Sequence, residues 1–101
     1  MTGGTAIQNE IRALIEAPLR DDSRSELEHA LTDGYAHALT LEAERHRLER
    51  RLSEAVASLS RSAAARPEEV ASLGRQIEEA DSRLVQLRGL LVSLRARFDQ
   101  A

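Results

Sequence analysis

The sequence contains no cysteine, no tryptophan and no lysine, and its only aromatic residues are Tyr35 and Phe98. Without cysteine the chain has no disulfide frame, no thiolate metal site and no cysteine nucleophile. Two aromatic rings are too few for a thick globular core, because such rings usually supply much of its buried area. These absences favour a fold built from long, thin elements.

Long apolar runs are also missing. No window approaches the roughly eighteen consecutive apolar residues that a membrane-spanning helix requires. The stretch from Met1 to Ala17 lacks the basic segment and following apolar run that mark a secretory signal. We therefore expect a protein that does not enter a membrane and that is located in the cytoplasm.

Charge of both signs is abundant instead. Charged residues make up 31% of the 101 positions and hydrophobic residues 42%, which is typical of coiled coils and other long-helix proteins. All 14 basic residues are arginine, and the formal net charge is −3. A net negative chain has no bulk attraction to phosphate, so nucleic acid is not an expected partner.

The first predicted helix covers residues 5–17. Thr5 and Gln8 form a Thr-x-x-Gln capping box, in which each side chain satisfies a free backbone N–H at the helix start. Pro18 disfavours helical geometry at Ala17, so the helix ends there. Its apolar residues recur at helical spacing and form one stripe: Ile7, Ile11, Leu14 and Ile15. A helix this short is marginal alone and must dock on something.

The second predicted helix covers residues 23–60. Ser23 and Glu26 form a second capping box. The core positions that follow alternate steps of four and three, which is a heptad pattern. Gly34 and Arg45 depart from the apolar rule at these positions. The seam reads Leu27, Leu31, Gly34, Ala38, Leu41, Arg45, Leu48, Leu52, Ala55 and Leu59.

The third predicted helix covers residues 67–99. Pro67 suits a first helical position because its missing N–H would be unpaired there. The second seam reads Val70, Leu73, Ile77, Ala80, Leu84, Leu87, Leu91, Leu94 and Phe98. Heptad spacing sustained without a slip is the most specific signal in the sequence.

Two long helices joined by a short connection favour antiparallel neighbours. We therefore predict an all-α fold in one domain over residues 1–101: a short N-terminal helix and a long antiparallel coiled-coil hairpin. The preferred register places Leu48 by Ile77 and Arg45 by Ala80, with the connection between residues 59 and 66. A seven-residue slip, which sets Gly34 against Phe98, is the alternative and leaves a very tight turn.

A two-helix seam buries little area, so a further element must complete the core. Helix 5–17 can fold over the hairpin, or a second copy can add its helices to form a bundle. Five apolar residues off the seam mark where this happens. We expect the polar seam residue Arg45 to reach solvent or to pair with Glu42, Glu49 or Asp81, with a role as partner selector as the alternative. The predicted interface is Tyr35, Leu39, Arg45, Val85, Leu90 and Val92.

No constellation of catalytic or metal-binding residues is evident. His29, His37 and His46 point to different sides of their predicted helix and do not converge on a metal. The arginines of residues 45–51 alternate with acids at spacings that favour intrahelical ion pairs. We expect neither an enzyme nor a cofactor.

One helical motif carries a resemblance. Glu68, Ser72 and Arg75 resemble the opening of the Glu-x-x-x-Ser-x-x-Arg-x-x-x-Gln-x-x-x-Asp motif of cyclic-di-GMP-binding anti-sigma factors, whose motif lies on antiparallel coiled-coil helices. The last two positions here are Glu79 and Arg83. The resemblance implies an anion-binding role for Glu68, Ser72 and Arg75.

Two functions follow from these observations. The first is a non-enzymatic interaction protein, an adaptor, regulator or chaperone-like subunit that works through helix–helix contacts. Its expected partners are a second copy, giving a homodimer, and another protein. The alternative is a helical regulator that senses a small anionic ligand such as a cyclic dinucleotide, or that binds a transcription factor or nucleic acid.

Overall fold

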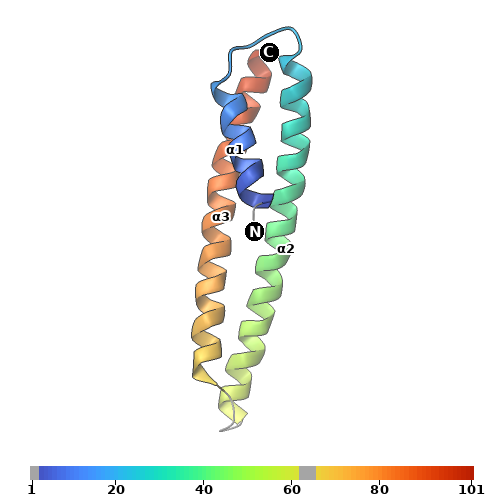
Figure 1. Cartoon of the computed structure of the whole chain (residues 1–101). Coiled ribbons are helices and arrows are strands. Elements are labelled where there is room, and N and C mark those ends of the chain that lie inside the picture. The colour runs from blue at the N-terminus through green and yellow to red at the C-terminus, as the bar shows by residue number, and fades with distance from the viewer. Residues whose placement is uncertain (1–2, 62–65) are drawn as a thin grey trace. The chain divides into compact units, whose positions relative to one another are not determined.

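The computed structural model describes the backbone of residues 3–61 and 66–101, with the side chains of residues 6–61 and 66–101. These ranges contain helices α1 (Gly3–Glu16), α2 (Ser23–Arg61) and α3 (Pro67–Gln100) and no strand (Figure 1). The predicted all-α class is thereby confirmed for the described residues. The coiled-coil geometry and the dimer stay predictions.

Helix α1 begins earlier and ends earlier than the sequence predicts. It starts at Gly3 instead of Thr5, whose side chain lies outside the described residues. The last helical bond runs from the Ala17 N–H to the Ala13 carbonyl at 3.0 Å, and Pro18 prevents a further turn.

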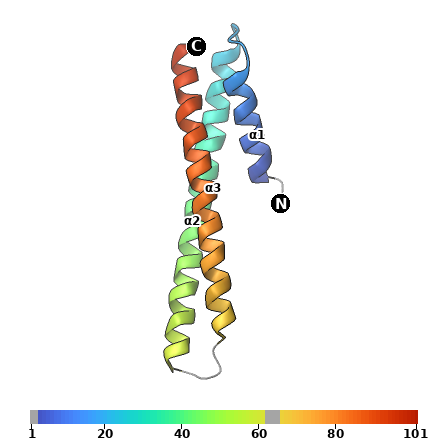
Figure 2. The same cartoon turned by 90° about the vertical axis from the view of Figure 1, so that its left-hand side faces the viewer.

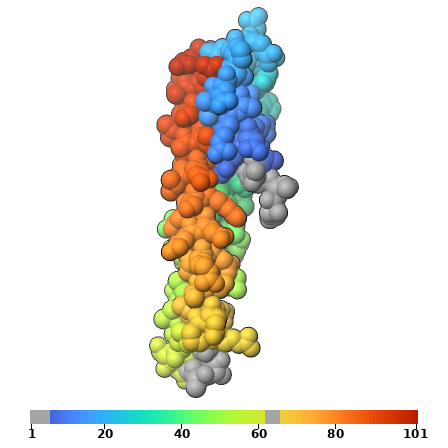
Figure 3. All heavy atoms as spheres, turned by 60° about the vertical axis from the view of Figure 1, so that its left-hand side comes forward, coloured from blue at the N-terminus to red at the C-terminus, as the bar shows by residue number. Residues whose placement is uncertain are grey.

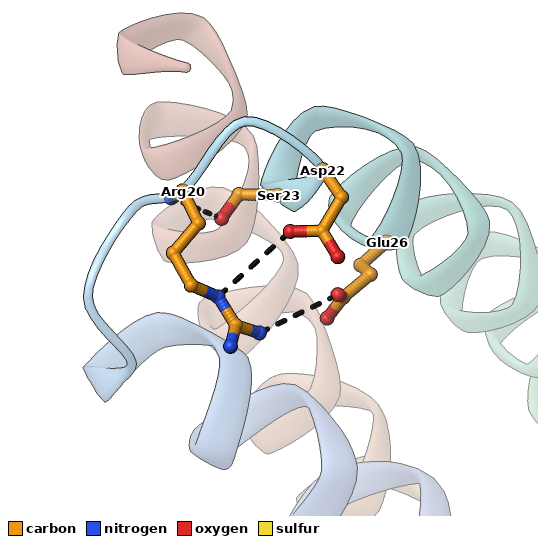
Figure 4. Close-up of polar contacts among 4 residues, drawn as sticks. All are labelled: Arg20, Asp22, Ser23 and Glu26. Atoms are coloured by element: carbon orange, nitrogen blue, oxygen red, sulfur yellow. Dashed lines mark hydrogen bonds and ion pairs between the residues drawn. The ribbon is translucent and has the colours of Figure 1, made fainter.

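The predicted capping box, in which Ser23 pairs with Glu26, is wrong. The Ser23 Oγ accepts a hydrogen bond from the backbone N–H of Arg20 at 2.6 Å (Figure 4). The first bond of α2 runs from the Glu26 N–H to the Asp22 carbonyl at 3.4 Å, so Asp22 is the N-cap residue. The Arg20 guanidinium lies 3.8 Å from Asp22 and 3.7 Å from Glu26. These contacts tie the linker to the start of α2.

The end of α2 and the start of α3, which flank the connection, lie within one residue of their predicted positions. Helix α2 continues to Arg61, one residue past its predicted end, and α3 begins at Pro67, as predicted. The connection between the two helices is therefore shorter than the predicted span of residues 59–66. The Glu69 N–H donates to the Arg66 carbonyl at 3.1 Å at the start of α3. Residues 62–65, on which the rest of the predicted connection falls, lie outside the described residues.

The chain divides into two compact units, each described by itself. Unit 1 comprises Met1–Leu39 with Val85–Ala101, and unit 2 comprises Thr40–Leu84. The single domain over residues 1–101 stays a prediction.

Unit 1 is a three-helix arrangement in which α1 lies along α2 and α3 (Figure 2). Ile11 of α1 is 1% exposed and lies beside Gly34 of α2. A Cβ atom built on Gly34 of α2 would lie 2.5 Å from Cδ2 of Leu91 and 3.3 Å from Cδ1 of Ile11. A methyl group at position 34 would therefore require the Leu91 side chain to move. The space-filling view shows α1 in contact with α3 (Figure 3).

The C-terminal end of α1 is capped by a side chain from another helix. α1 has no basic residue in its own last turn. The Arg97 guanidinium of α3 donates a hydrogen bond to the Ala17 carbonyl just after α1. A positive charge at this end opposes the negative end of the helix dipole. Arg97 therefore links α1 to α3 by charge, as Ile11 links it by packing.

Unit 2 contains two antiparallel helical segments. Its core comprises Leu48, Leu73 and Ala80, with Leu52, Ala55 and Ile77 packed against it. In this unit, residue numbers rise along α2 as they fall along the neighbouring α3. The same holds in unit 1, where Arg24 near the start of α2 donates a hydrogen bond to the Phe98 carbonyl near the end of α3 at 3.4 Å. The packing of α2 and α3 is thus consistent with the predicted hairpin.

Contacts in each unit agree with the preferred register. Gly34 faces Leu91 in unit 1, and Arg45 meets Asp81 in unit 2. The slipped register, which sets Gly34 against Phe98, is therefore wrong. The seam positions are buried or half-buried throughout, apart from Leu59 near the end of α2, which is exposed.

The close approach at Gly34 predicts opposite effects of two glycine substitutions. Gly34→Ala adds a methyl group against buried Leu91 and Ile11, and overpacking of this kind costs about 1–3 kcal/mol. Gly89→Ala meets nothing within 4 Å, so it gains the helix preference of alanine, about 0.5–1 kcal/mol. Thermal unfolding followed by circular dichroism should rank them Gly89→Ala, wild type, Gly34→Ala. Equal stabilisation by both substitutions would contradict the close approach.

The cross-helix cap predicts that Arg97 holds α1 in place. Arg97→Met keeps most of the side-chain length and removes the charge, so α1 should open more readily by about 1–2 kcal/mol. Hydrogen exchange at the amides of α1 should then accelerate roughly tenfold, while unit 2 is unaffected. Arg83→Met, at an exposed position of α3 in unit 2, is the control and should leave α1 exchange unchanged. Unchanged α1 exchange in Arg97→Met would mean that packing alone holds the helix.

Candidate functional site

Four of the six predicted interface residues are exposed apolar side chains of unit 1. Tyr35 and Leu39 on α2 are 47% and 68% exposed, and Val85 and Val92 on α3 are 69% and 71% exposed. Side chains of this kind are usually covered when they recur at helical spacing. In unit 1, α1 does not cover them.

The position of α1 explains why these four residues stay exposed. Arg97 marks the side of α3 that faces α1, and Val85 and Val92 lie about 120° and 140° around the helix from it, at 100° per residue. On α2, Ala30 is buried although it lies outside the seam, so it marks the side that α1 covers. Tyr35 and Leu39 lie about 140° and 180° around α2 from Ala30. Both pairs therefore lie on the side of their helices that faces away from α1. We call this surface of Tyr35, Leu39, Val85 and Val92 the open face.

Leu90 does not belong to the open face. It lies about 200° around α3 from Val92 and on the same side as Arg97, seven residues further along. It is half-buried, as expected for a residue beside α1. The structure thus separates Leu90 from the other four apolar residues with which the sequence groups it.

Charged residues flank the open face, and Arg88 lies within it, between Val85 and Val92 on the same side of α3. Glu28 precedes Tyr35 by seven residues on α2, and Asp99 follows Val92 by seven on α3, so each shares its side of the helix. Arg95 forms an ion pair with Asp99 at 3.4 Å. Arg24 lies over the Phe98 ring at 4.1 Å from its centroid. Each helix thus contributes one acid and one arginine to the end of the face beyond its apolar residues.

Arg45, the sixth predicted interface residue, lies in unit 2. Its guanidinium leaves the seam, reaches Asp81 at 2.9 Å and lies 3.8 Å from Glu49. The side chain remains 38% exposed. Its Nε atom is buried and makes no hydrogen bond, because the Glu49 carboxylate is beyond hydrogen-bond reach. In unit 2, the charge is therefore neutralised within the chain, at the expense of one buried donor.

The predicted anion-binding residues lie along α3 in unit 2. Glu68, Ser72 and Arg75 follow each other at steps of four and three, which places them on one face of the helix. Ser72 accepts a hydrogen bond from the Gln76 side-chain amide at 3.2 Å, while Glu68 and Arg75 are exposed. No described contact joins the three residues, and their anion-binding role stays a prediction.

Other surfaces of the described residues offer less. No group of three or more potential metal ligands is present in residues 3–61 and 66–101. A small hollow in unit 1 lies beneath the linker, lined in part by Leu14, Pro18 and Leu27. A shallow depression in unit 2 is lined by residues of α2 alone, from His46 to Glu54. Within the same ranges, none of the helices combines the length and apolar character required to cross a membrane.

Sequence reasoning missed three features around the open face: the role of Gly34, the cap by Arg97 and the charged borders. A glycine at a heptad core position is the signal for a close approach, but it reads equally as a break in the seam. Arg97 has no local signal, because its partner is 80 residues away in sequence. The border residues Glu28 and Asp99 lie seven residues from Tyr35 and Val92, a spacing that is visible in the sequence once the open face is known.

No model of a known protein family, no curated protein and no solved structure matches this chain.

The contacts of Arg45 predict that an apolar residue at this seam position stabilises unit 2. Arg45→Leu fills the seam and removes a buried donor without a hydrogen bond, while Asp81 remains partly solvated. We expect a gain of about 1 kcal/mol, or roughly 4–8 °C in Tm for a chain of this size. Arg50→Leu, at an exposed position of α2, should change stability by less than about 0.5 kcal/mol. A lower Tm for Arg45→Leu would show instead that the Arg45–Asp81 ion pair is net stabilising.

Proposed function

We propose that this chain is a non-enzymatic interaction protein that works through helix–helix contacts. We further propose that the open face of unit 1 receives the α2 and α3 helices of a second copy. The observation that carries the proposal is the exposure of four apolar side chains on the side of unit 1 that faces away from α1.

The composition of the open face favours burial. Leu39, Val85 and Val92 are each about two-thirds exposed or more. Burying apolar area releases about 25 cal/mol for each Å², so a partner that covers these side chains gains free energy without rearranging α1. Exposed apolar groups that recur on one face mark interaction sites more often than those that are scattered singly.

The charges of the open face favour a second copy as the partner. The α2 border carries Glu28 and the α3 border carries Arg95, so the face presents both signs. A twofold axis can bring the acidic border of one copy to the basic border of the other, which makes the face complementary to itself. A strongly basic or acidic partner would instead meet a like charge on one of the two helices.

The fold offers binding surfaces in preference to a reaction site. An active site requires convergent polar groups in a hollow. The hollow beneath the linker is small, and the depression along α2 is shallow. Helix faces, by contrast, are the ordinary means by which adaptor and regulator proteins recognise other helices.

The proposal predicts concentration-dependent self-association that a single charge on the open face weakens. Val92→Glu introduces a carboxylate at a position that is 71% exposed, so the monomer stays helical while the contact must desolvate a charge. The dissociation constant should rise roughly tenfold or more, and light scattering over a wide concentration range measures it.

Gln86→Glu is the matched control. It adds the same charge at an exposed position of α3 about 120° around the helix from Val92, outside the open face. Self-association should be unchanged in this variant. A wild-type chain that is monomeric at every concentration, or equal weakening by Val92→Glu and Gln86→Glu, would contradict the proposal.

A further inference from the structure

We infer that the two copies pair about a twofold axis parallel to their helices, so that α2 of one copy lies against α3 of the other through the open faces. This inference rests on the proposed function and adds the symmetry and register of the contact. It follows from the levels of the residues along the helices and from the charges that those levels bring together.

The level of each residue is fixed by contacts inside unit 1. Gly34 of α2 lies beside Leu91 of α3, and Arg24 lies beside Phe98. Partners across the pair thus have residue numbers that add up to about 122–125. Rotation about an axis parallel to the helices keeps every residue at its own level. The same sum therefore identifies which residue of the second copy's α3 each residue of α2 meets.

Applied to the open face, this rule brings apolar residues together. Leu39 meets Val85 of the second copy, since their numbers add up to 124. Tyr35 and Val92 of the second copy add up to 127, so they are offset by two to five residues, about 3–7.5 Å along the helices, which the long tyrosine side chain can span. The symmetry repeats both contacts, so all four side chains of each copy are covered. The contact is also antiparallel, like the packing of α2 on α3 inside the unit.

The rule also pairs opposite charges at the borders. Glu28 meets Arg95 of the second copy and Arg24 meets Asp99 of the second copy, each with numbers adding up to 123. Both pairs lie beyond the apolar residues, where border charges set partner orientation more than affinity. Each pair occurs twice in the dimer because of the symmetry.

The other twofold arrangement, with the axis across the helices, is less favourable. In that arrangement the second copy runs in the opposite direction along the helices. Its α2 then packs on α2 of the first copy, and its α3 packs on α3. Glu28 and Arg95 lie on different helices, as do Arg24 and Asp99, so this arrangement separates both pairs of opposite charge. Complementary charges across an interface favour the partner orientation that brings them together. The border charges thus favour the axis parallel to the helices.

Two complementary charge reversals test the register. Glu28→Arg and Arg95→Glu each create two like-charge pairs in a homodimer, so each variant alone should dimerise about tenfold more weakly than wild type. In an equimolar mixture, Arg at 28 meets Glu at 95 and the natural pair forms at the second site. Heterodimers should therefore recover wild-type affinity, as measured by sedimentation and by native mass spectrometry with a mass tag on one variant.

A variant outside the face and cysteine pairs complete the experiment. Glu10→Arg, at an exposed position of α1, makes the same change of charge and should leave dimerisation unchanged. Because the chain has no cysteine, a mixture of Leu39→Cys and Val85→Cys should give a disulfide-linked heterodimer on oxidation. A dimer that instead links Tyr35→Cys to Leu39→Cys, or shows no recovery on mixing, would overturn the register and leave the proposed self-association standing. A wild-type monomer would overturn both.

Discussion

The close approach of α2 and α3 at Gly34 is the constraint on which unit 1 depends. Leu91 occupies the space that a side chain at position 34 would take, and Ile11 of α1 lies over the same point. The missing Cβ therefore lets side chains of α3 and of the short helix α1 pack against the α2 backbone at the same point. Because interiors are closely packed, such a point admits few alternative arrangements. Because Gly34 faces Leu91 there, the two helices adopt the preferred register and not the one slipped by seven residues.

The regular parts of this structure were predictable because they repeat. Heptad spacing in Leu27 to Leu59 and in Val70 to Phe98 is a signal summed over many positions, so it indicated both long helices and their antiparallel register. The irregular parts depend on single contacts that no local pattern encodes. Ser23 illustrates this: its Ser-x-x-Glu spacing suggests a capping box, yet Arg20 supplies a competing donor and shifts the cap to Asp22.

The candidate site was predicted in part, for the same physical reason. Apolar residues off the seam are visible in the sequence, but the side of the pair to which each points depends on where α1 docks. Leu90 and Val92 are two residues apart and lie on opposite sides of α3, one beside α1 and one on the open face. A sequence pattern groups them, and only the contacts of Ile11 and Arg97 separate them.

The asymmetry that α1 creates explains why a second copy would meet unit 1 on one side alone. One groove is filled by Ile11 and closed by the Arg97 cap, so a partner there must first displace a tethered helix. The open face has four exposed apolar side chains in each copy. A typical stable interface buries about 1,200–2,000 Å² in total and involves roughly 20–30 residues on each side, so these four supply a small part of it. Affinity from this face alone is therefore modest. Under that condition border charges such as Glu28 and Arg95 gain importance, since they decide orientation when the apolar contact is small.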